Sequence, residues 1–313
     1  MSVVPRAGIR KVTVVANCHA GPISQLLAFH GLDLHVDGIY LSSWHDPGSD
    51  VRQRGQRLLH EPGTDDLVFS FNVTGDFDSL ETSRLKRVYG DRLITFTNIR
   101  FDGLHPDATF LGSFAKRWVN FLPGFHSKIV VHSYAAGRSA RECLALFNGQ
   151  VYDKLGYYDI FARSESELRL RDRICEVKLC DMLFDLVPDE YCLMTPNHPT
   201  SVVFCRMVKM LCDRAGITFV PYDERMFPNP LMNAPVWPIF NEIAEHFRLR
   251  YRTPQYFVRG LRRELVSASL SISLEEFINA SYDFYDKHYP RPLFVKRAAE
   301  MDEASRFSSV IAS

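Results

Sequence analysis

The first hundred residues alternate short apolar runs with helix-like segments, and this alternation constrains the fold most strongly. Residues 12–16 (VTVVA) form a β-branched run that suits a strand buried on both faces. Residues 23–29 follow with the helical spacing of apolar side chains. Similar runs at residues 38–42, 66–73 and 92–99 predict three further strands. Strands at this spacing, with helical segments between them, favour a small parallel sheet with helices on its faces.

From about residue 112 the pattern becomes mainly helical. Ser164 and Glu167 have the spacing of a capping box, which predicts the start of a long helix that runs to Pro188. Ser273 and Glu276 predict a second capped helix. The other elements expected here are a helix at 114–121, a strand at 128–134 leading into a helix at 139–147, a helix at 201–214 capped by Thr200, and the body of the second capped helix at 274–288.

We therefore predict an α/β fold in which a small parallel sheet, the core of an N-terminal α/β subdomain, is embedded in a predominantly helical structure. We expect residues 10–110 to form the α/β subdomain, with a site at its strand ends. Residues 111–297 are expected to form the helical remainder, packed with the subdomain as one compact unit. Residues 298–313 are expected to form a tail that is dispensable, like the first ten residues.

Composition excludes several classes of protein. Lys+Arg and Asp+Glu both number 37, which argues against a nucleic-acid-binding surface. No run approaches the ~18 apolar residues of a membrane span, and the apolar run near the N-terminus is too short for a secretory signal. The seven cysteines are odd in number and form no CxxC pair, so we expect neither a disulfide framework nor a metal site. These features predict a cytoplasmic protein.

Polar side chains follow each predicted strand of the sheet. Ligands of open α/β sheets bind outside the carboxyl ends of the strands, so this convergence predicts a site there. The segments that fall at these ends are Asn17 to His19, Ser42 to His45, Asn72 to Thr74, and Asn98 to Asp102.

Cys18 and His19 stand out because they lie between the first strand and the first helix. The partial positive charge of a helix N-terminus lowers the pKa of a thiol, and its exposed amides can stabilise an oxyanion or a phosphate. Cys18 could equally be a small buried filler, which is the usual fate of a free cysteine. His19 could act as a general base or make only a local hydrogen bond. Adjacent residues rarely point at the same atom, so a base for Cys18 is expected from elsewhere in the chain.

Two further histidines, His105 and His198, precede prolines, which favour an extended conformation for the preceding residue. Such segments can place a side chain rigidly at the rim of a sheet, although turn chemistry explains them as well. Residues 131–139 predict another strand-to-helix transition that is rich in small residues and carries Arg138. This transition would suit a diphosphate against helix amides, although it matches no known phosphate loop. The chain contains no GxGxxG, Walker or GxSxG motif.

Four stretches, VVANCHAGPI, FDGLHPDATF, VHSYAAGRS and TPNHPT, occur in an order that resembles the WcbI family of capsular polysaccharide biosynthesis proteins. The resemblance covers roughly residues 10–290. It implies a cytoplasmic protein of surface-polysaccharide assembly that binds coenzyme A, with acetyl-CoA as acyl donor for O-acetylation of a capsule sugar. It also implies a small α/β subdomain within a mainly helical structure. Many relatives carry glutamine in place of His19, so the resemblance implies a more secure role for Cys18 than for His19.

We interpret the chain as an acetyl-CoA-dependent O-acetyltransferase that uses no metal. His198 or His19 would be the base, and Cys18 would be either an acyl-accepting nucleophile or a neighbour of the thioester sulfur. The amides after Cys18, with Asn17, would stabilise the oxyanion. The residues expected to bind the carrier are Ser133, Tyr134, Arg138, His105, Lys116 and Arg117.

Two alternatives remain open at this point. A deacetylase or esterase could use the same groups with water, and the strand-end placement of Cys18 is loosely similar to that of the nucleophile in SGNH hydrolases. A non-catalytic coenzyme A-binding protein could instead help to assemble other capsule biosynthesis enzymes. The expected partners are acetyl-CoA and a capsular sugar or polysaccharide acceptor, with no nucleic acid.

Overall fold

The computed structural model describes residues 9–30, 34–113, 116–260, 271–301 and 303–312. Contacts within the chain fall into two compact units, each assembled from three segments. The first unit comprises Met1–Arg100, Ser166–Leu186 and His198–Leu231, and the second comprises Phe101–Glu165, Val187–Asn197 and Met232–Ser313. The chain first leaves the first unit after Arg100, about ten residues before the subdomain boundary that we expected at 110.

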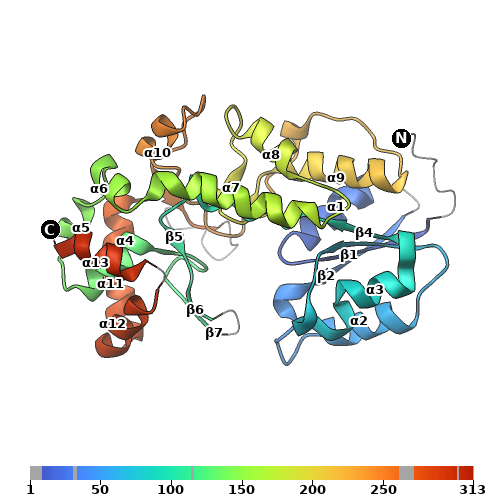
Figure 1. The fold of residues 1–313 in the computed structure, drawn as a ribbon, viewed down its shortest axis with the longest axis horizontal. Coiled ribbons are helices and arrows are strands. Elements are labelled where there is room, and N and C mark those ends of the chain that lie inside the picture. Colours follow the sequence, from blue (N-terminus) through green and yellow to red (C-terminus); the bar gives the residue numbers. More distant parts are fainter. Residues whose placement is uncertain (1–8, 31–33, 114–115, 261–270, 302, 313) are drawn as a thin grey trace. The chain divides into compact units, whose positions relative to one another are not determined.

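The first unit is built on a four-stranded parallel sheet, which confirms the fold class (Figure 1). The strand order is β2-β1-β3-β4, so β1 lies between two neighbours. Val14 of β1 stands opposite Gly38 and Phe69, and residues 12–16 are buried, as expected for a strand in a parallel sheet that is covered on both faces. The strands are β1 Lys11–Ala16, β2 His35–Tyr40, β3 Asp66–Phe71 and β4 Leu93–Phe96.

Helices cover both faces of this sheet. Helices α2 and α3 lie on one face and α1 and α9 on the other (Figure 1), and α1 packs against α9. The helices are α1 Ala20–His30, α2 Val51–His60, α3 Thr82–Tyr89, α8 Cys180–Leu186 and α9 Ser201–Ala215, joined by short 3₁₀ turns η1 Leu41–Ser43, η2 Gly75–Leu80, η3 Gly90–Arg92 and η5 Glu224–Met226, with strand β10 at His198–Pro199.

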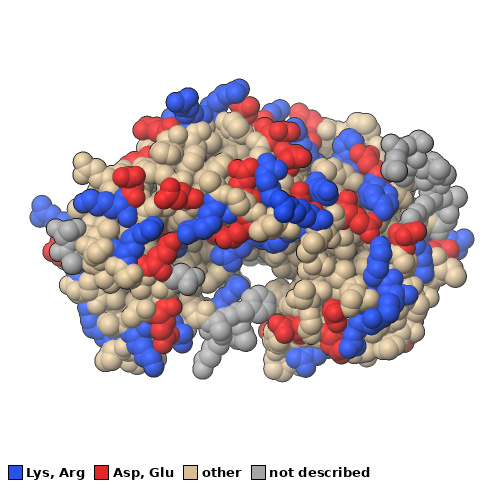
Figure 2. All heavy atoms as spheres, viewed as in Figure 1, with Lys and Arg blue, Asp and Glu red and all other residues tan. Residues whose placement is uncertain are grey.

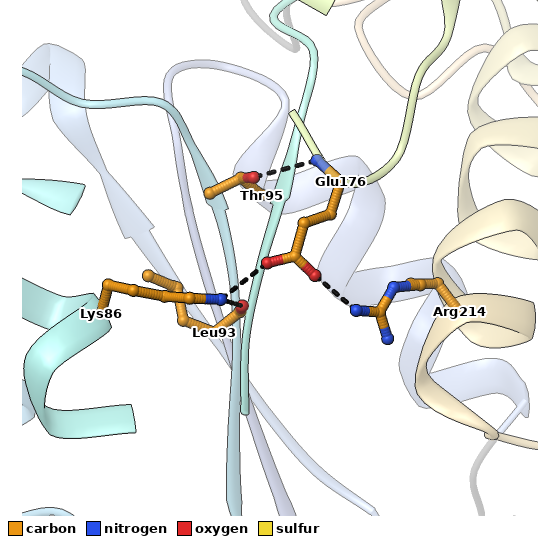
Figure 3. Close-up of polar contacts among 5 residues, drawn as sticks. All are labelled: Lys86, Leu93, Thr95, Glu176 and Arg214. Carbon is orange, nitrogen blue, oxygen red and sulfur yellow. Dashed lines mark hydrogen bonds and ion pairs between the residues drawn. The ribbon is translucent and has the colours of Figure 1, made fainter. Parts of the chain in front are cut away.

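A short segment at Glu176 and Val177 covers the edge of β4 that faces away from β3 (Figure 3). The backbone amides of Glu176 and Val177 both donate to the carbonyl oxygen of Thr95, at 3.0 and 2.9 Å. The carboxylate of Glu176 pairs with Lys86 of α3 at 2.8 Å and with Arg214 of α9 at 2.6 Å. The exposed edge of the sheet is therefore paired and bordered by charge, which discourages further strand addition.

The second unit combines short helices with two-stranded antiparallel ribbons around an aromatic core. Tyr285 and Phe294 pack at 4.5 Å between ring centroids, and Phe257 stacks on Phe277 at 3.9 Å. Its elements are η4 Asp102–Leu104, β5 Ala108–Thr109, β6 Leu111–Ser113, β7 Lys116–Trp118, β8 His126–Ser127, α4 Lys128–Ala135, α5 Ala140–Leu144, α6 Gly149–Lys154, β9 Leu193–Thr195, α10 Asn241–His246, β11 Tyr256–Val258, β12 Ser271–Ser273, α11 Leu274–His288, α12 Arg291–Ala299 and α13 Ala304–Ala312, together with α7 Tyr157–Arg173 up to Glu165.

Two expected elements are wrong at the start of this unit. Instead of a helix at 114–121, β6 and β7 pair antiparallel, with residues 114 and 115 outside the described part. Instead of a strand at 128–134, helix α4 begins at Lys128. The Oγ of Ser127 accepts from the amide of Val130 at 3.1 Å and caps this helix. Capping and burial therefore outweigh the β-propensity of the Ile-Val-Val run.

The helix expected from Ser164 to Pro188 is also wrong. Helix α7 already begins at Tyr157, and Ser164 lies inside it, where its Oγ accepts from the amide of Asp102 at 2.9 Å. The helix ends at Arg173, and a separate helix, α8, begins at Cys180. By contrast, α9 and α11 confirm the helices expected at 201–214 and 274–288, the latter with its Ser273–Glu276 capping box.

Residues 304–312, near the C-terminus, form a helix. Helix α13 carries Phe307, whose side chain is fully buried and stacks on the imidazole of His132 with a centroid distance of 4.4 Å. A fully buried phenylalanine contributes several kcal/mol of burial and packing. This packing argues against the expectation that residues 298–313 are dispensable.

Candidate functional site

The turn between β1 and α1 lies at the carboxyl edge of the sheet, next to β2 and β3. Asn17 builds this turn. Its Oδ1 accepts from the amide of His19 at 3.1 Å and from the Sγ of Cys18 at 3.6 Å, and its carbonyl oxygen accepts from the amide of Ala20 at 3.1 Å. The two amides after Cys18 therefore already donate within the turn. Because Oδ1 faces the backbone, Nδ2 is the Asn17 atom that can donate to a ligand.

The environment of Cys18 differs from our expectation. The residue is half-buried, and burial raises the pKa of its thiol to about 11, against a smaller lowering by a backbone hydrogen bond. Burial therefore acts against the lowering that we expected from the helix N-terminus, because desolvation disfavours the thiolate. At neutral pH the side chain is a thiol.

His19 is a packing residue. Its side chain is fully buried, and its ring meets the edges of Phe71 at 5.5 Å and Phe204 at 5.3 Å between centroids. A ring enclosed in this way cannot approach a sugar hydroxyl, which disfavours His19 as the base.

His198 lies in β10, just before helix α9. The first turn of α9 carries Phe204, which touches His19, so the start of this helix lies at the same edge of the sheet as the Cys18 turn. Burial lowers the pKa of His198 to about 4, and the imidazole is neutral at physiological pH. A neutral imidazole can accept a proton, as a general base must. The amide of Ser201, at the start of α9, donates to the Oδ1 of Asn229 at 2.8 Å, a cap that the sequence did not reveal.

Tyr40 is a residue of this edge that the sequence analysis missed. It ends β2 opposite Ala16, the last residue of β1. A Cβ built on Gly21 would lie 2.7 Å from the Tyr40 hydroxyl oxygen, so this hydroxyl lies against the first turn of α1. The only sequence signal was an aromatic residue in the middle of the strand predicted at 38–42.

The polar residues that we expected at the other strand ends of the first unit lie at the carboxyl edge of the sheet. Ser42 lies in η1 after β2, Asn72 follows β3, and Asn98 follows β4, all at the carboxyl edge. Asp102, which we grouped with them, belongs to the second unit.

The residues expected to bind the carrier all belong to the second unit, whereas Asn17, Cys18, His19 and His198 belong to the first. Burial lowers the pKa of His105 to about 3, and its side chain is only 2% exposed. The next residues of its motif have a clear structural role. Asp107 is buried, and its Oδ1 accepts from the amide of Ile129 at 3.0 Å and from the hydroxyl of Tyr157 at 2.6 Å.

The expected phosphate-binding transition at 131–139 is absent, because Ser133 and Tyr134 lie inside helix α4. Ser133 is fully buried. The Tyr134 hydroxyl donates to Asp286 at 2.5 Å, and the guanidinium of Arg291 lies 4.8 Å from its ring. A phosphate has no access to the backbone amides of a helix interior, which are already bonded.

The three remaining cations differ in their surroundings. Arg138 follows α4 and is half-exposed. The guanidinium of Arg117 lies 3.9 Å from the ring of Phe110. Lys116 stands opposite Ser113 in the β6–β7 ribbon. Their contact with a carrier stays a prediction.

The described residues contain no group of three or more His, Cys, Asp and Glu side chains that could hold a metal ion. All seven cysteines are free thiols. In the described ranges, no helix combines the length and apolar character needed to span a membrane. Positive and negative side chains intermingle on the face shown in Figure 2, in keeping with the balanced net charge.

The chain is an α/β protein in which a half-buried thiol and a neutral histidine lie at the carboxyl edge of a parallel sheet, the edge at which open α/β sheets bind ligands. The chain belongs to the WcbI family of polysaccharide biosynthesis enzymes, whose family model matches residues 11–219.

A solved structure is similar over almost the whole chain. It covers 97% of this chain and 98% of its own, with a TM-score of 0.70 and 13% sequence identity. That protein is described as WcbI, a novel polysaccharide biosynthesis enzyme, in a native form without a disulfide bond between coenzyme A and one of its cysteines. At this identity the likeness establishes the fold. No curated protein matches the chain.

Proposed function

We propose that this chain is an O-acetyltransferase that moves an acetyl group from acetyl-CoA to a hydroxyl of a capsular polysaccharide sugar. The observation that carries the proposal is the Cys18 turn, in which Asn17 holds a half-buried thiol at the carboxyl edge of β1. Membership of the polysaccharide biosynthesis family and the coenzyme A named for the similar solved structure support it. The seven free thiols suit the reducing cytoplasm, where we place the protein.

The chemistry needs a base, an oxyanion donor and a place for the thioester. In the proposed reaction the Nε2 or Nδ1 of His198 takes the proton from the acceptor hydroxyl, and the hydroxyl oxygen attacks the thioester carbonyl. The developing oxyanion accepts from the Nδ2 of Asn17. The carbon–sulfur bond then breaks, and the departing thiolate of coenzyme A takes the proton from His198. The products are an O-acetyl sugar and free coenzyme A.

Cys18 is proposed to lie beside the sulfur of the carrier and not to accept the acetyl group. Because burial raises the pKa of the thiol to about 11, little of the nucleophilic thiolate is present at neutral pH. Direct transfer predicts that no acetyl group appears on Cys18 by mass spectrometry and that Cys18→Ser keeps most of its activity. An acetylated Cys18 in the wild type would instead establish a ping-pong reaction.

The first measurement is thermal unfolding with acetyl-CoA and coenzyme A. Ligand at 100 times its Kd adds about 2.7 kcal/mol to the free energy of unfolding, so both compounds should raise the Tm. No rise at millimolar ligand would refute carrier binding.

The second measurement is transfer of labelled acetyl to polysaccharide. Loss of the base in His198→Gln should lower the rate by about 10²–10⁴-fold. The exposed His60, changed to Gln, is the matched control. Unchanged transfer in a folded His198→Gln protein would favour a non-catalytic assembly role. Release of acetate from an acetyl ester without coenzyme A would favour the esterase alternative.

A further inference from the structure

A groove of about 400 Å³ lies among helices α4, α12 and α13 of the second unit. Its volume falls within the ~300–1,000 Å³ typical of small-molecule sites. Its walls combine one cationic residue, one buried imidazole, several apolar side chains and Ser308, whose hydroxyl donates to the carbonyl oxygen of Ala304 at 2.9 Å. The groove is lined by His132, Arg138, Ala135, Val295, Ala298 and Ile311, among others.

His132 supplies a polar atom that the protein itself does not use. Its side chain is 6% exposed, and its Nε2 has no hydrogen-bond partner among the described residues. The ring is fixed by stacking on Phe307 at 4.4 Å, with an interplanar angle of 15°. A buried polar atom without a partner costs about 1–3 kcal/mol, a cost that a bound ligand would remove. Burial, reinforced by the charge of Lys128, lowers the pKa of His132 to about 4, so the imidazole is neutral.

Arg138 supplies the charge. It makes no ion pair within 4.0 Å to the described part of the chain. The charge of Arg138 helps to lower the pKa of the nearby Glu142 carboxyl, whose Oε2 accepts from the amide and the hydroxyl of Ser139 at 2.8 and 2.6 Å. The guanidinium is always charged, and its donors are not held in an ion pair with the described residues, so they can bind a ligand.

We propose that this groove binds a small organic monocarboxylate with a short hydrocarbon body. The carboxylate accepts from the guanidinium of Arg138 and from the imidazole of His132, and the hydrocarbon lies against the alanine and valine side chains. One cationic group and one neutral donor match a single negative charge. A phosphate dianion would keep about one uncompensated charge in a partly apolar groove, which is costly.

The proposed carboxylate site does not depend on the proposed acetyl transfer. From the sequence we predicted a carrier phosphate near Arg138, so the two assignments of this arginine must be distinguished. If the groove is a separate site, saturating coenzyme A leaves the affinity for the carboxylate unchanged.

The test is calorimetric titration of the full chain with hexanoate, with hexylamine and with inorganic phosphate. Hexanoate should bind saturably at millimolar concentration, and hexylamine, which has the same chain and the opposite charge, should not. Arg138→Gln should weaken hexanoate binding about tenfold or more, since a charge-assisted hydrogen bond is lost. Arg141→Gln, which removes an exposed charge of α5 outside the groove, should not change it.

A second variant guards against misfolding. Ala299 lines the groove and is exposed, so Ala299→Leu should fold normally while it narrows the groove and weakens hexanoate binding. Absence of saturable hexanoate binding would overturn the proposal, as would equal affinity in both variants. Binding of phosphate in preference to hexanoate, or displacement of hexanoate by coenzyme A, would also overturn it. A protein that binds hexanoate and not coenzyme A would sustain this site and refute the proposed transfer.

Discussion

At the residue scale, the edge of the sheet is organised by close contacts that sequence motifs do not encode. Asn17 was a candidate for oxyanion stabilisation because of its place in the turn, and the hydrogen bonds of its Oδ1 show how the turn is held. The pKa of Cys18 could not be predicted from its place before a helix. It depends on how many side chains from other segments desolvate the thiol, and that is a tertiary property.

The contact between Gly21 and Tyr40 gives a residue-scale prediction. Gly21→Ala places a methyl group 2.7 Å from the hydroxyl oxygen of the exposed Tyr40 side chain, which must move, so we expect a loss of up to about 1 kcal/mol in the free energy of unfolding. The nearest ring carbon would be 3.5 Å away, an ordinary contact. Removing the hydroxyl in Gly21→Ala/Tyr40→Phe should therefore restore stability.

Urea unfolding of the two single variants and the double variant measures this coupling. The double variant Gly21→Ala/Tyr40→Phe should even be more stable than the single variant Tyr40→Phe, because alanine is favoured over glycine in a helix by about 1 kcal/mol. Gly48→Ala, where a Cβ meets nothing within 4 Å, is the control. Additive effects of the two changes would contradict the contact.

At the element scale, the sequence predicted those elements whose signals are local. The Ser273–Glu276 box predicted the start of α11 because both capping bonds form, and the helix ends at His288 as expected. Helix α4 was missed because its cap partly comes from Asp107, twenty-one residues before the helix begins. The start of α7 was missed because Ser164 bonds to Asp102 and not to its own helix. Long-range partners of this kind leave no periodic pattern in the sequence.

Asp107 gives the prediction for the α4 element. Asp107→Ala removes the acceptor for the amide of Ile129 and the hydroxyl of Tyr157, both enclosed in the second unit. Each unsatisfied donor costs about 1–3 kcal/mol, so we expect a loss of about 2–6 kcal/mol. Asp107→Asn keeps one carbonyl acceptor and should cost clearly less. Chemical unfolding measures both, and equal losses in the two variants would mean that the side-chain oxygen does not cap α4.

At the scale of the whole molecule, the acidic and basic residues balance, and the ion pairs, such as Arg169 with Asp181, mostly join exposed side chains. Exposed pairs of this kind contribute about 0–1 kcal/mol each. The response of stability to pH is therefore expected to come from enclosed groups. Burial lowers the pKa of five histidines below 6.5, the value of a free side chain. They are His30, His105, His126, His132 and His198.

The sign of the effect follows from proton binding. In the folded chain, His126, His132 and His198 bind a proton only near pH 4, and His105 only near pH 3. In the unfolded chain, each of these histidines binds a proton once the pH falls to about 6.5. The unfolded state therefore holds more protons in this window. The neutral imidazoles therefore make their full contribution to the free energy of unfolding above pH 6.5. This contribution is lost as the pH falls toward 4, by up to about 1.4 kcal/mol per histidine per pH unit.

Urea unfolding between neutral pH and about pH 5 should therefore show a free energy of unfolding that falls with a slope of about three protons. His105→Gln should remove about one proton from this slope, because it deletes an imidazole that stays neutral in the folded state. The exposed His60, changed to Gln, should leave the slope unchanged. A flat profile over this range would mean that the enclosed imidazoles take up protons without unfolding. In that case neither His198 nor His132 would be held neutral by the fold, and the base in the proposed transfer and the uncharged donor in the groove would both need another source.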